Sequence, residues 1–204
     1  MKSALILYPH QLFPADQLPE VHTVVVVEDP ILFGVDQQAP QKLHKQKLIL
    51  HRASLRRYVE EILWPAGAQV DYVELDVFMN SGDVLDRVKG FDHVYLFDPV
   101  DEALTQRLLQ ARRERADGPP VDFLPNPNFY LKEQEVREYF GNQHKAFASF
   151  YQWQRERFNI LIGSDYKPEG GKWMFDVDAH TLPKGRVLPS FAAFGENKHV
   201  HEAV

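Results

Sequence analysis

Ala-Leu-Ile-Leu-Tyr at residues 4–8 and Thr-Val-Val-Val-Val at residues 23–27 are the two stretches that decide the fold. Each is a short, almost unbroken apolar run without alternation, which is typical of a strand covered on both faces of a parallel sheet. Each run stops at turn-forming residues, since Pro9 and Pro14 bracket the segment after the first run and Pro30 follows the second. We therefore expect two buried strands of a parallel sheet.

The rest of the first 125 residues alternates between helix-like and strand-like patterns. Strands are predicted over 70–75, 93–97 and 121–124, and helices over 41–64, 80–89 and 101–115. This order predicts an α/β fold with a doubly wound, Rossmann-like, five-stranded parallel sheet and helices on both faces.

The chain is expected to contain this domain over 1–125 and a helical and irregular connector over 126–204. Within the connector, 132–140 and 145–162 are predicted helices, and 197–204 resembles the first turns of another helix.

Composition narrows the possible functions. The 204 residues are 44% hydrophobic and 25% charged, which excludes a disordered chain. A net charge of -6 argues against a general polyanion binder. The chain has no cysteine, which excludes disulfides, thiolate nucleophiles and iron–sulfur ligation and is compatible with a cytoplasmic location. No apolar run approaches the roughly 20 residues of a membrane span, so no membrane association is expected.

Sequence patterns typical of catalytic sites are absent. The chain contains no GxGxxG after its first strand, no GxxxxGK[ST], no GxSxG and no HExxH. No catalytic residue and no metal site are therefore predicted. His199 and His201 are expected to belong to a solvated tail, because no third ligand stands nearby in the sequence. Gly170 and Gly171 are interpreted as a flexible turn rather than a phosphate cradle.

In an open α/β sheet, ligands bind beyond the carboxyl ends of the strands, where the strand order reverses. Here these ends are 10–13, 28–29, 75–76 and 98–99. His10 and Gln11 could hold a planar heterocycle there, or could belong to an ordinary surface loop. Glu28 could accept a bond from a ribose-like hydroxyl, or could complement the dipole of the next helix.

Two helical segments also carry polar or aromatic side chains with two interpretations. The lysines at the start of the 41–64 helix either form a solvated face or point at an anionic group. Ser54 either faces a ligand or bonds back to its own helix. The predicted 145–162 helix interleaves aromatic residues with arginines, and core packing is favoured over a nucleic-acid surface for this cluster. Its members are Phe147, Phe150, Tyr151, Trp153, Arg155, Arg157 and Phe158.

Five motifs, taken in order, resemble one known family. They are His-Gln-Leu-Phe at 10–13, Val-Glu-Asp-Pro at 27–30, Lys-Leu-His-Lys-Gln-Lys-Leu-Ile-Leu-His-Arg-Ala-Ser at 42–54, Phe-Tyr-Gln-Trp-Gln-Arg at 150–155 and Gly-Gly-Lys-Trp-Met-Phe-Asp at 170–176. The family is that of the deoxyribodipyrimidine photolyase-related proteins, the prokaryotic photolyase and cryptochrome group with an iron–sulfur cluster. The resemblance runs from about residue 3 to the end.

The resemblance implies an N-terminal Rossmann-like domain that binds an antenna chromophore of the ribityllumazine type. A connector would lead to a helical domain that carries FAD, a 4Fe-4S cluster and the DNA-binding cleft, and these would exist only in a full-length parent. By matching position, the chromophore would be lined by His10, Gln11, Leu12, Glu28, Leu32, Phe33, His44, Lys47 and His51. His10 stands where many relatives have Asp, and 178–181 replaces an Asn-Arg pair of the connector.

The expected function is therefore that of a light-harvesting domain from a protein of light-dependent DNA repair or blue-light sensing, inactive in repair by itself. The alternative is a chromophore-free interaction module of the same fold.

Overall fold

The protein is described by a computed structural model that covers residues 1–141, 146–175, 190 and 197–204. It divides into two compact units, one formed by 1–129 together with 195–204 and the other by 130–194. Asp176 of the last motif and the connector segment 178–181 lie outside the described residues.

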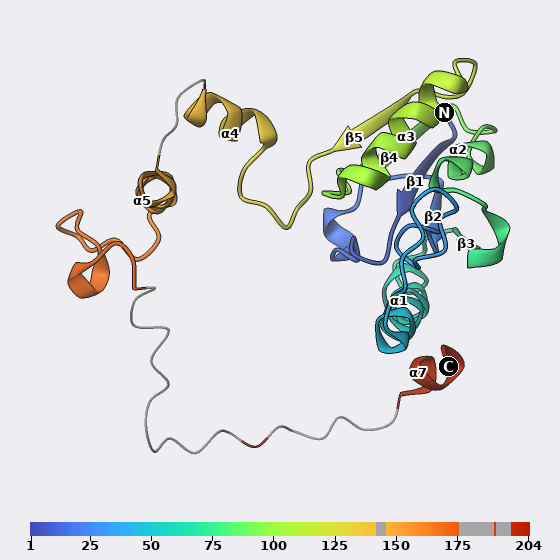
Figure 1. The fold of residues 1–204 in the computed structure, drawn as a ribbon, viewed down its shortest axis with the longest axis horizontal. Coiled ribbons are helices and arrows are strands. Elements are labelled where there is room, and N and C mark those ends of the chain that lie inside the picture. The colour runs from blue at the N-terminus through green and yellow to red at the C-terminus, as the bar shows by residue number, and fades with distance from the viewer. Residues whose placement is uncertain (142–145, 176–189, 191–196) are drawn as a thin grey trace. The chain divides into compact units, whose positions relative to one another are not determined.

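The first unit is built on the predicted five-stranded parallel sheet (Figure 1). Its strands are β1 (Ser3–Leu7), β2 (Thr23–Val27), β3 (Val70–Val73), β4 (His93–Phe97) and β5 (Val121–Leu124). Their order is β3-β2-β1-β4-β5, and all four pairings are parallel. The order reverses between β1 and β4, as in a Rossmann-like sheet, so the fold prediction is confirmed.

Helices cover both faces of this sheet (Figure 1). One face carries α1 (Lys45–Tyr58) and its continuation as a π-helical segment, Val59–Leu63. The other face carries α2 (Val84–Arg87) and α3 (Glu102–Glu114). Because each face is buried under helices, β1 and β2 are buried at every position, which explains their unbroken apolar runs.

Polar residues fix where these helices begin. The His44 ring accepts a hydrogen bond from the Gln46 amide ahead of α1, and the Asp101 carboxylate accepts one from Leu104 at the start of α3. Asn80 forms a reciprocal capping box with Asp83 over the 3-10 turn that precedes α2. The caps at Asn80 and Asp101 account for the helix starts expected near 80 and 101, whereas α1 begins at Lys45, four residues later than predicted.

The second unit contains α4 (Glu133–Phe140) and α5 (Phe147–Phe158). Phe150 of α5 packs against Tyr139 and Phe140 with ring centroids 5.1 and 4.9 Å apart, but no aromatic side chain of α5 is fully buried. Phe147 remains exposed. Arg155 is buried and donates to the main-chain carbonyls of Ile160, Leu161, Lys172 and Trp173, so its guanidinium is used inside this unit.

The C-terminal residues form a helix, α7 (Lys198–Glu202), which belongs to the first unit and packs against α1. The expectation of a solvated histidine tail is wrong for His199, which is only 1% exposed, whereas His201 is exposed. Glu60 lies close to His199 in the fold, so a further possible metal ligand comes from a residue that is distant in the sequence. Among the described residues, no helix is both long enough and apolar enough to cross a membrane.

Candidate functional site

The loops after β1 and β4 meet where the strand order reverses. His10 follows β1, and its Nε2 lies 2.8 Å from the carbonyl oxygen of Pro99. Gln11 is fully buried beside it and donates from Nε2 to the carbonyl oxygens of Phe97 and Asp98 at 3.0 and 3.3 Å. These bonds hold two of the predicted side chains at the crossover position that the topology assigns to ligands.

Predicted residues from three elements converge beside this crossover. The rings of Phe33, in the loop after β2, and His51, on α1, lie 5.8 Å apart. His51 also lies close enough to His10 and Lys47 to be influenced by their charges. Burial, Lys47 and His10 all lower the pKa of His51, and burial lowers the pKa of His10 against an opposing hydrogen bond to Pro99. Both imidazoles are therefore neutral near pH 7, each with a donor and an acceptor nitrogen.

Glu28 is fully buried at the end of β2, on the face covered by α1. Arg52 of α1 binds both of its carboxylate oxygens, at 2.8 and 2.6 Å, while the Tyr72 hydroxyl and the Leu75 amide also donate to it. Burial alone would raise the pKa of Glu28, but these donors together bring it below its ordinary value. The carboxylate is thus ionised, and its hydrogen bonds are satisfied within the protein.

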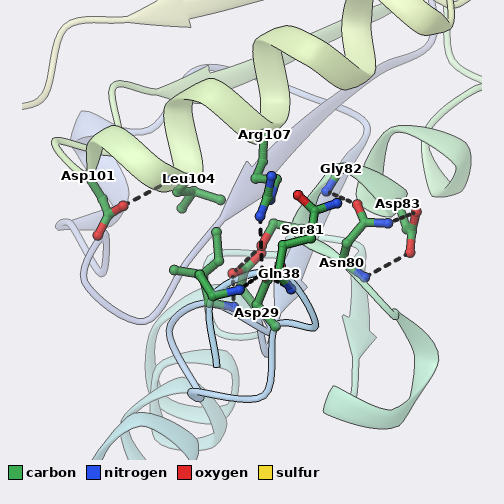
Figure 2. A network of polar contacts seen from close by, with 12 residues as sticks. Asp29, Gln38, Asn80, Ser81, Gly82, Asp83, Asp101, Leu104 and Arg107 are labelled. Carbon is green, nitrogen blue, oxygen red and sulfur yellow. Dashed lines mark hydrogen bonds and ion pairs between the residues drawn. The ribbon is translucent and has the colours of Figure 1, made fainter. Parts of the chain in front are cut away.

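Asp29 comes one residue later and lies on the opposite face, because side chains alternate between the two faces along a strand. Its Oδ1 accepts bonds from Ser81 at 2.7 Å and from the Ile31 amide at 2.9 Å. Figure 2 shows Arg107 pointing from α3 into the polar group that contains Asp29 and Ser81. Arg107 lies 3.3 Å from Asp36, which is also fully buried.

Burial raises the pKa of Asp29 to about 6, despite the bonds that oppose the shift. Sequence reasoning missed Tyr8, Asp36, Ser81 and Arg107 as parts of this polar group. The alternation of β2 could have placed Asp29, but Arg107 comes from 71 positions beyond its partner Asp36 and meets it only through tertiary packing.

A cavity of about 560 Å³ opens at the carboxyl ends of β2 and β3. Its size lies within the usual range for sites that hold small organic molecules. Arg52 forms part of its wall, so the buried Glu28 lies directly behind that wall. The same guanidinium lies 6.0 Å from the Phe33 ring, which connects the cavity to the group around His51. Its lining is completed by Val35, Gln37, Glu74, Leu75, Asp76, Phe78 and Met79.

Several buried polar atoms at this edge of the sheet have no hydrogen-bond partner within the described chain. They are Tyr8 Oη, His10 Nδ1, Gln11 Oε1, Asp29 Oδ2, Asp36 Oδ2, His51 Nε2 and Arg107 Nε. Buried polar groups in folded proteins are almost always paired, so such a concentration is characteristic of a place where water or a ligand completes the bonds. The arrangement is suited to binding a polar ring system.

The remaining predicted residues are more peripheral. Leu12 packs at the margin of the core under α1, and Leu32 packs at the margin of the core under α2 and α3. His44 is exposed and uses Nδ1 to cap α1. Lys47 is exposed one turn before His51. Ser54 bonds back to the carbonyls of Leu50 and His51, so the back-bonding interpretation of Ser54 is the one that the structure supports.

Comparison with known proteins identifies the family of this chain. The model of the family described as deoxyribodipyrimidine photo-lyase-related protein matches residues 5–204. The chain belongs to this family.

Two relatives of the photolyase-related chain differ greatly in length. The uncharacterized protein R852 of Acanthamoeba polyphaga mimivirus is 28% identical over 204 residues, which cover 94% of this chain and 100% of the viral protein. A (6-4) photolyase of Agrobacterium fabrum is 24% identical over 175 residues, which cover 79% of this chain and 32% of that enzyme. The chain thus corresponds to about a third of the photolyase and to the whole of the viral protein.

Proposed function

We propose that this photolyase-related chain is a light-harvesting module that binds a ribityllumazine-type chromophore at the carboxyl edge of its sheet. The observation that carries the proposal is a group of buried polar atoms on His10, Gln11 and His51, beside the Phe33 ring, that have no hydrogen-bond partner among the described residues. A lumazine ring offers both a flat aromatic surface and a rim of hydrogen-bonding atoms. These are the two features that this group of side chains would complement.

The protein's own part in this function is to bind, orient and exclude water. His10 and His51, neutral near pH 7, could each donate to or accept from the ring, and Phe33 could pack against its face. The ribityl chain carries hydroxyl groups, which Arg52 in the lining of the neighbouring cavity could bind. The chromophore itself would supply light absorption, with excitation passed to a flavin held by another domain or protein.

Repair of DNA is not proposed for this chain alone. The (6-4) photolyase relative is about three times as long as the segment it shares with this chain. FAD, a 4Fe-4S cluster and DNA would enter only through a longer parent or a partner protein that supplies those domains.

One observation favours the chromophore-free interaction module instead. The resemblance places Glu28 among the chromophore contacts, but its carboxylate accepts hydrogen bonds from Arg52, Tyr72 and the Leu75 amide. Gln11 likewise donates to two carbonyls of the protein. Part of the predicted site is therefore filled by internal contacts, which is what a module without chromophore would show.

The two functions are separated by titrating the purified chain with 6,7-dimethyl-8-ribityllumazine and recording its visible absorption. Binding should shift the band and saturate at one chromophore per chain. His51→Leu should weaken binding by about tenfold, the usual cost of one lost hydrogen bond in a binding site. His22→Leu, at the opposite edge of the sheet, is the matched control and should bind as the wild type does. An unshifted band with the folded wild-type chain would overturn the proposal.

A further inference from the structure

One buried side chain far from the sheet edge also lacks partners. His199, on α7, is 1% exposed, and neither of its ring nitrogens has a hydrogen-bond partner within the described chain. An imidazole carries at least one N–H donor, and its neutral form also carries an acceptor. Burying both nitrogens without partners costs free energy, so this ring calls for a partner that completes the site.

Three carboxylates face the two nitrogens of this ring. Nε2 lies 3.9 Å from a Glu60 oxygen and 4.0 Å from a Glu61 oxygen, and Nδ1 lies 3.9 Å from a Glu202 oxygen. These separations are too long for hydrogen bonds. One zinc ion binds only one of the two ring nitrogens, and its tetrahedral ligand atoms lie about 3.4 Å apart with bonds of about 2.0–2.2 Å. The carboxylate that faces this nitrogen is already near that spacing, and the carboxylate on the other side of the ring would turn toward the ion.

From this arrangement we propose that Glu60, His199 and Glu202 form a binding site for a divalent transition-metal ion, with Zn²⁺ as the best match. One ligand atom from each residue lies within 4.8 Å of the other two. Imidazole nitrogen and carboxylate oxygen are both ordinary zinc ligands, and three protein ligands leave a fourth position for water or for Glu61. The exposed Glu202 side chain can turn to close the remaining distance.

The backbone supports this placement. Glu60 and Glu61 lie on the π-helical segment Val59–Leu63, where the Trp64 amide bonds to the Val59 carbonyl at 3.0 Å. Single π-helical turns within α-helices are rare and occur frequently at functional sites. Here the turn carries two of the three carboxylates that face His199.

Lys198 competes with a metal for the same carboxylate. Its ammonium bonds to Glu60, so a metal ion must displace it from that carboxylate. Lys198 is 63% exposed and can turn into water when an ion takes its place. Removal of this competing charge should therefore strengthen metal binding, an effect that a purely structural ion pair would not produce.

The test uses the full chain and two probes, Zn²⁺ by calorimetry and Co²⁺ by its visible absorption. One ion should bind per chain, and Glu202→Gln and His199→Gln should each weaken binding by more than the 10- to 100-fold typical of lost outer-sphere partners. Lys198→Met should tighten it. His201→Gln, on the same helix but outside the group, should leave the affinity unchanged.

Glu202→Gln changes an exposed side chain, so circular dichroism should show an unaltered fold and the loss of affinity can be assigned to the site. The proposal is overturned if the wild-type chain gives neither heat nor an absorption band. It is equally overturned if Glu60→Gln and Glu202→Gln bind the metal as tightly as the wild type. None of these outcomes depends on lumazine binding, because the two sites share no residue.

Discussion

At the scale of single residues, the neighbouring carboxyl groups of Glu28 and Asp29 have opposite properties. Glu28 has four donors and a lowered pKa, whereas Asp29 has a raised pKa because burial outweighs its few bonds. The cause is the alternation of β2, which directs Glu28 toward Arg52 on α1 and Asp29 toward the other face. A single step along the chain therefore separates an ion pair from a carboxyl that titrates near neutrality.

The raised pKa of Asp29 makes stability depend on pH. The folded value is about 6 against an ordinary 3.8, so between these values the native state binds more protons than the unfolded state. The stabilisation is complete below about pH 4 and is lost as the pH rises through about 6. Relative to Asp29→Asn, the wild type should lose about 2–3 kcal/mol of unfolding free energy from about pH 4 to about pH 7.

Urea unfolding of both proteins across this range measures the effect. Other titrating groups are the same in both proteins and cancel in the difference between them. The amide of the variant keeps the Oδ1 acceptor for Ser81 and Ile31, so these hydrogen bonds are retained. A difference that does not change with pH would show that Asp29 is not a titrating buried carboxyl.

At the scale of elements, the connection from β2 to α1 sets the position of the candidate site, because it carries Phe33 and leads to the helix that carries His51. Gly34 bends this connection at φ +76°, a left-handed conformation that favours glycine. A Cβ at Gly34 would lie 2.2 Å from the carbonyl oxygen of Gln41. Gly34 therefore packs directly against the main chain of Gln41 in the same connection.

Gly34→Ala should lower the unfolding free energy by about 2–4 kcal/mol, because backbone strain and a main-chain clash act together. Gly67 is the matched control, since it has φ +78° but nothing within 4 Å of an added Cβ. Gly67→Ala should cost only about 1 kcal/mol, for the conformation alone. Denaturant midpoints compare the two, and equal losses would show that the contact with Gln41 is not limiting.

At the scale of the whole molecule, all buried hydrophobic residues that the structure describes lie within the first unit. Both hydrophobic clusters of the sheet consist of residues between Ala4 and Leu124, and neither includes a residue of α7 or of the second unit. One cluster lies under α1 and the other under α2 and α3, so each sheet face is closed by elements of 1–129.

Residues 1–129 expressed alone should therefore fold and unfold cooperatively, since this length is ample for an independent domain. Loss of α7 removes the exposed Lys198–Glu60 ion pair, which is expected to contribute little to stability because water screens both charges. Far-ultraviolet circular dichroism against urea, compared with the full chain, measures this. A gradual, non-cooperative loss of signal would show that the sheet needs residues beyond 129.

The sequence by itself determined the α/β class, the parallel strands and the helix starts near 80 and 101. These features depend on local signals: the buried runs at 4–8 and 23–27, and the caps at Asn80 and Asp101. It also predicted that His10, Phe33 and His51 would lie near one another, through position in the fold and family resemblance. Tertiary structure alone decided that Glu28 pairs with Arg52, that Asp36 pairs with Arg107, and that His199 is buried against Glu60. These pairings join residues separated by 24, 71 and 139 positions, and side-chain contacts at such separations depend on how helices pack rather than on any local pattern.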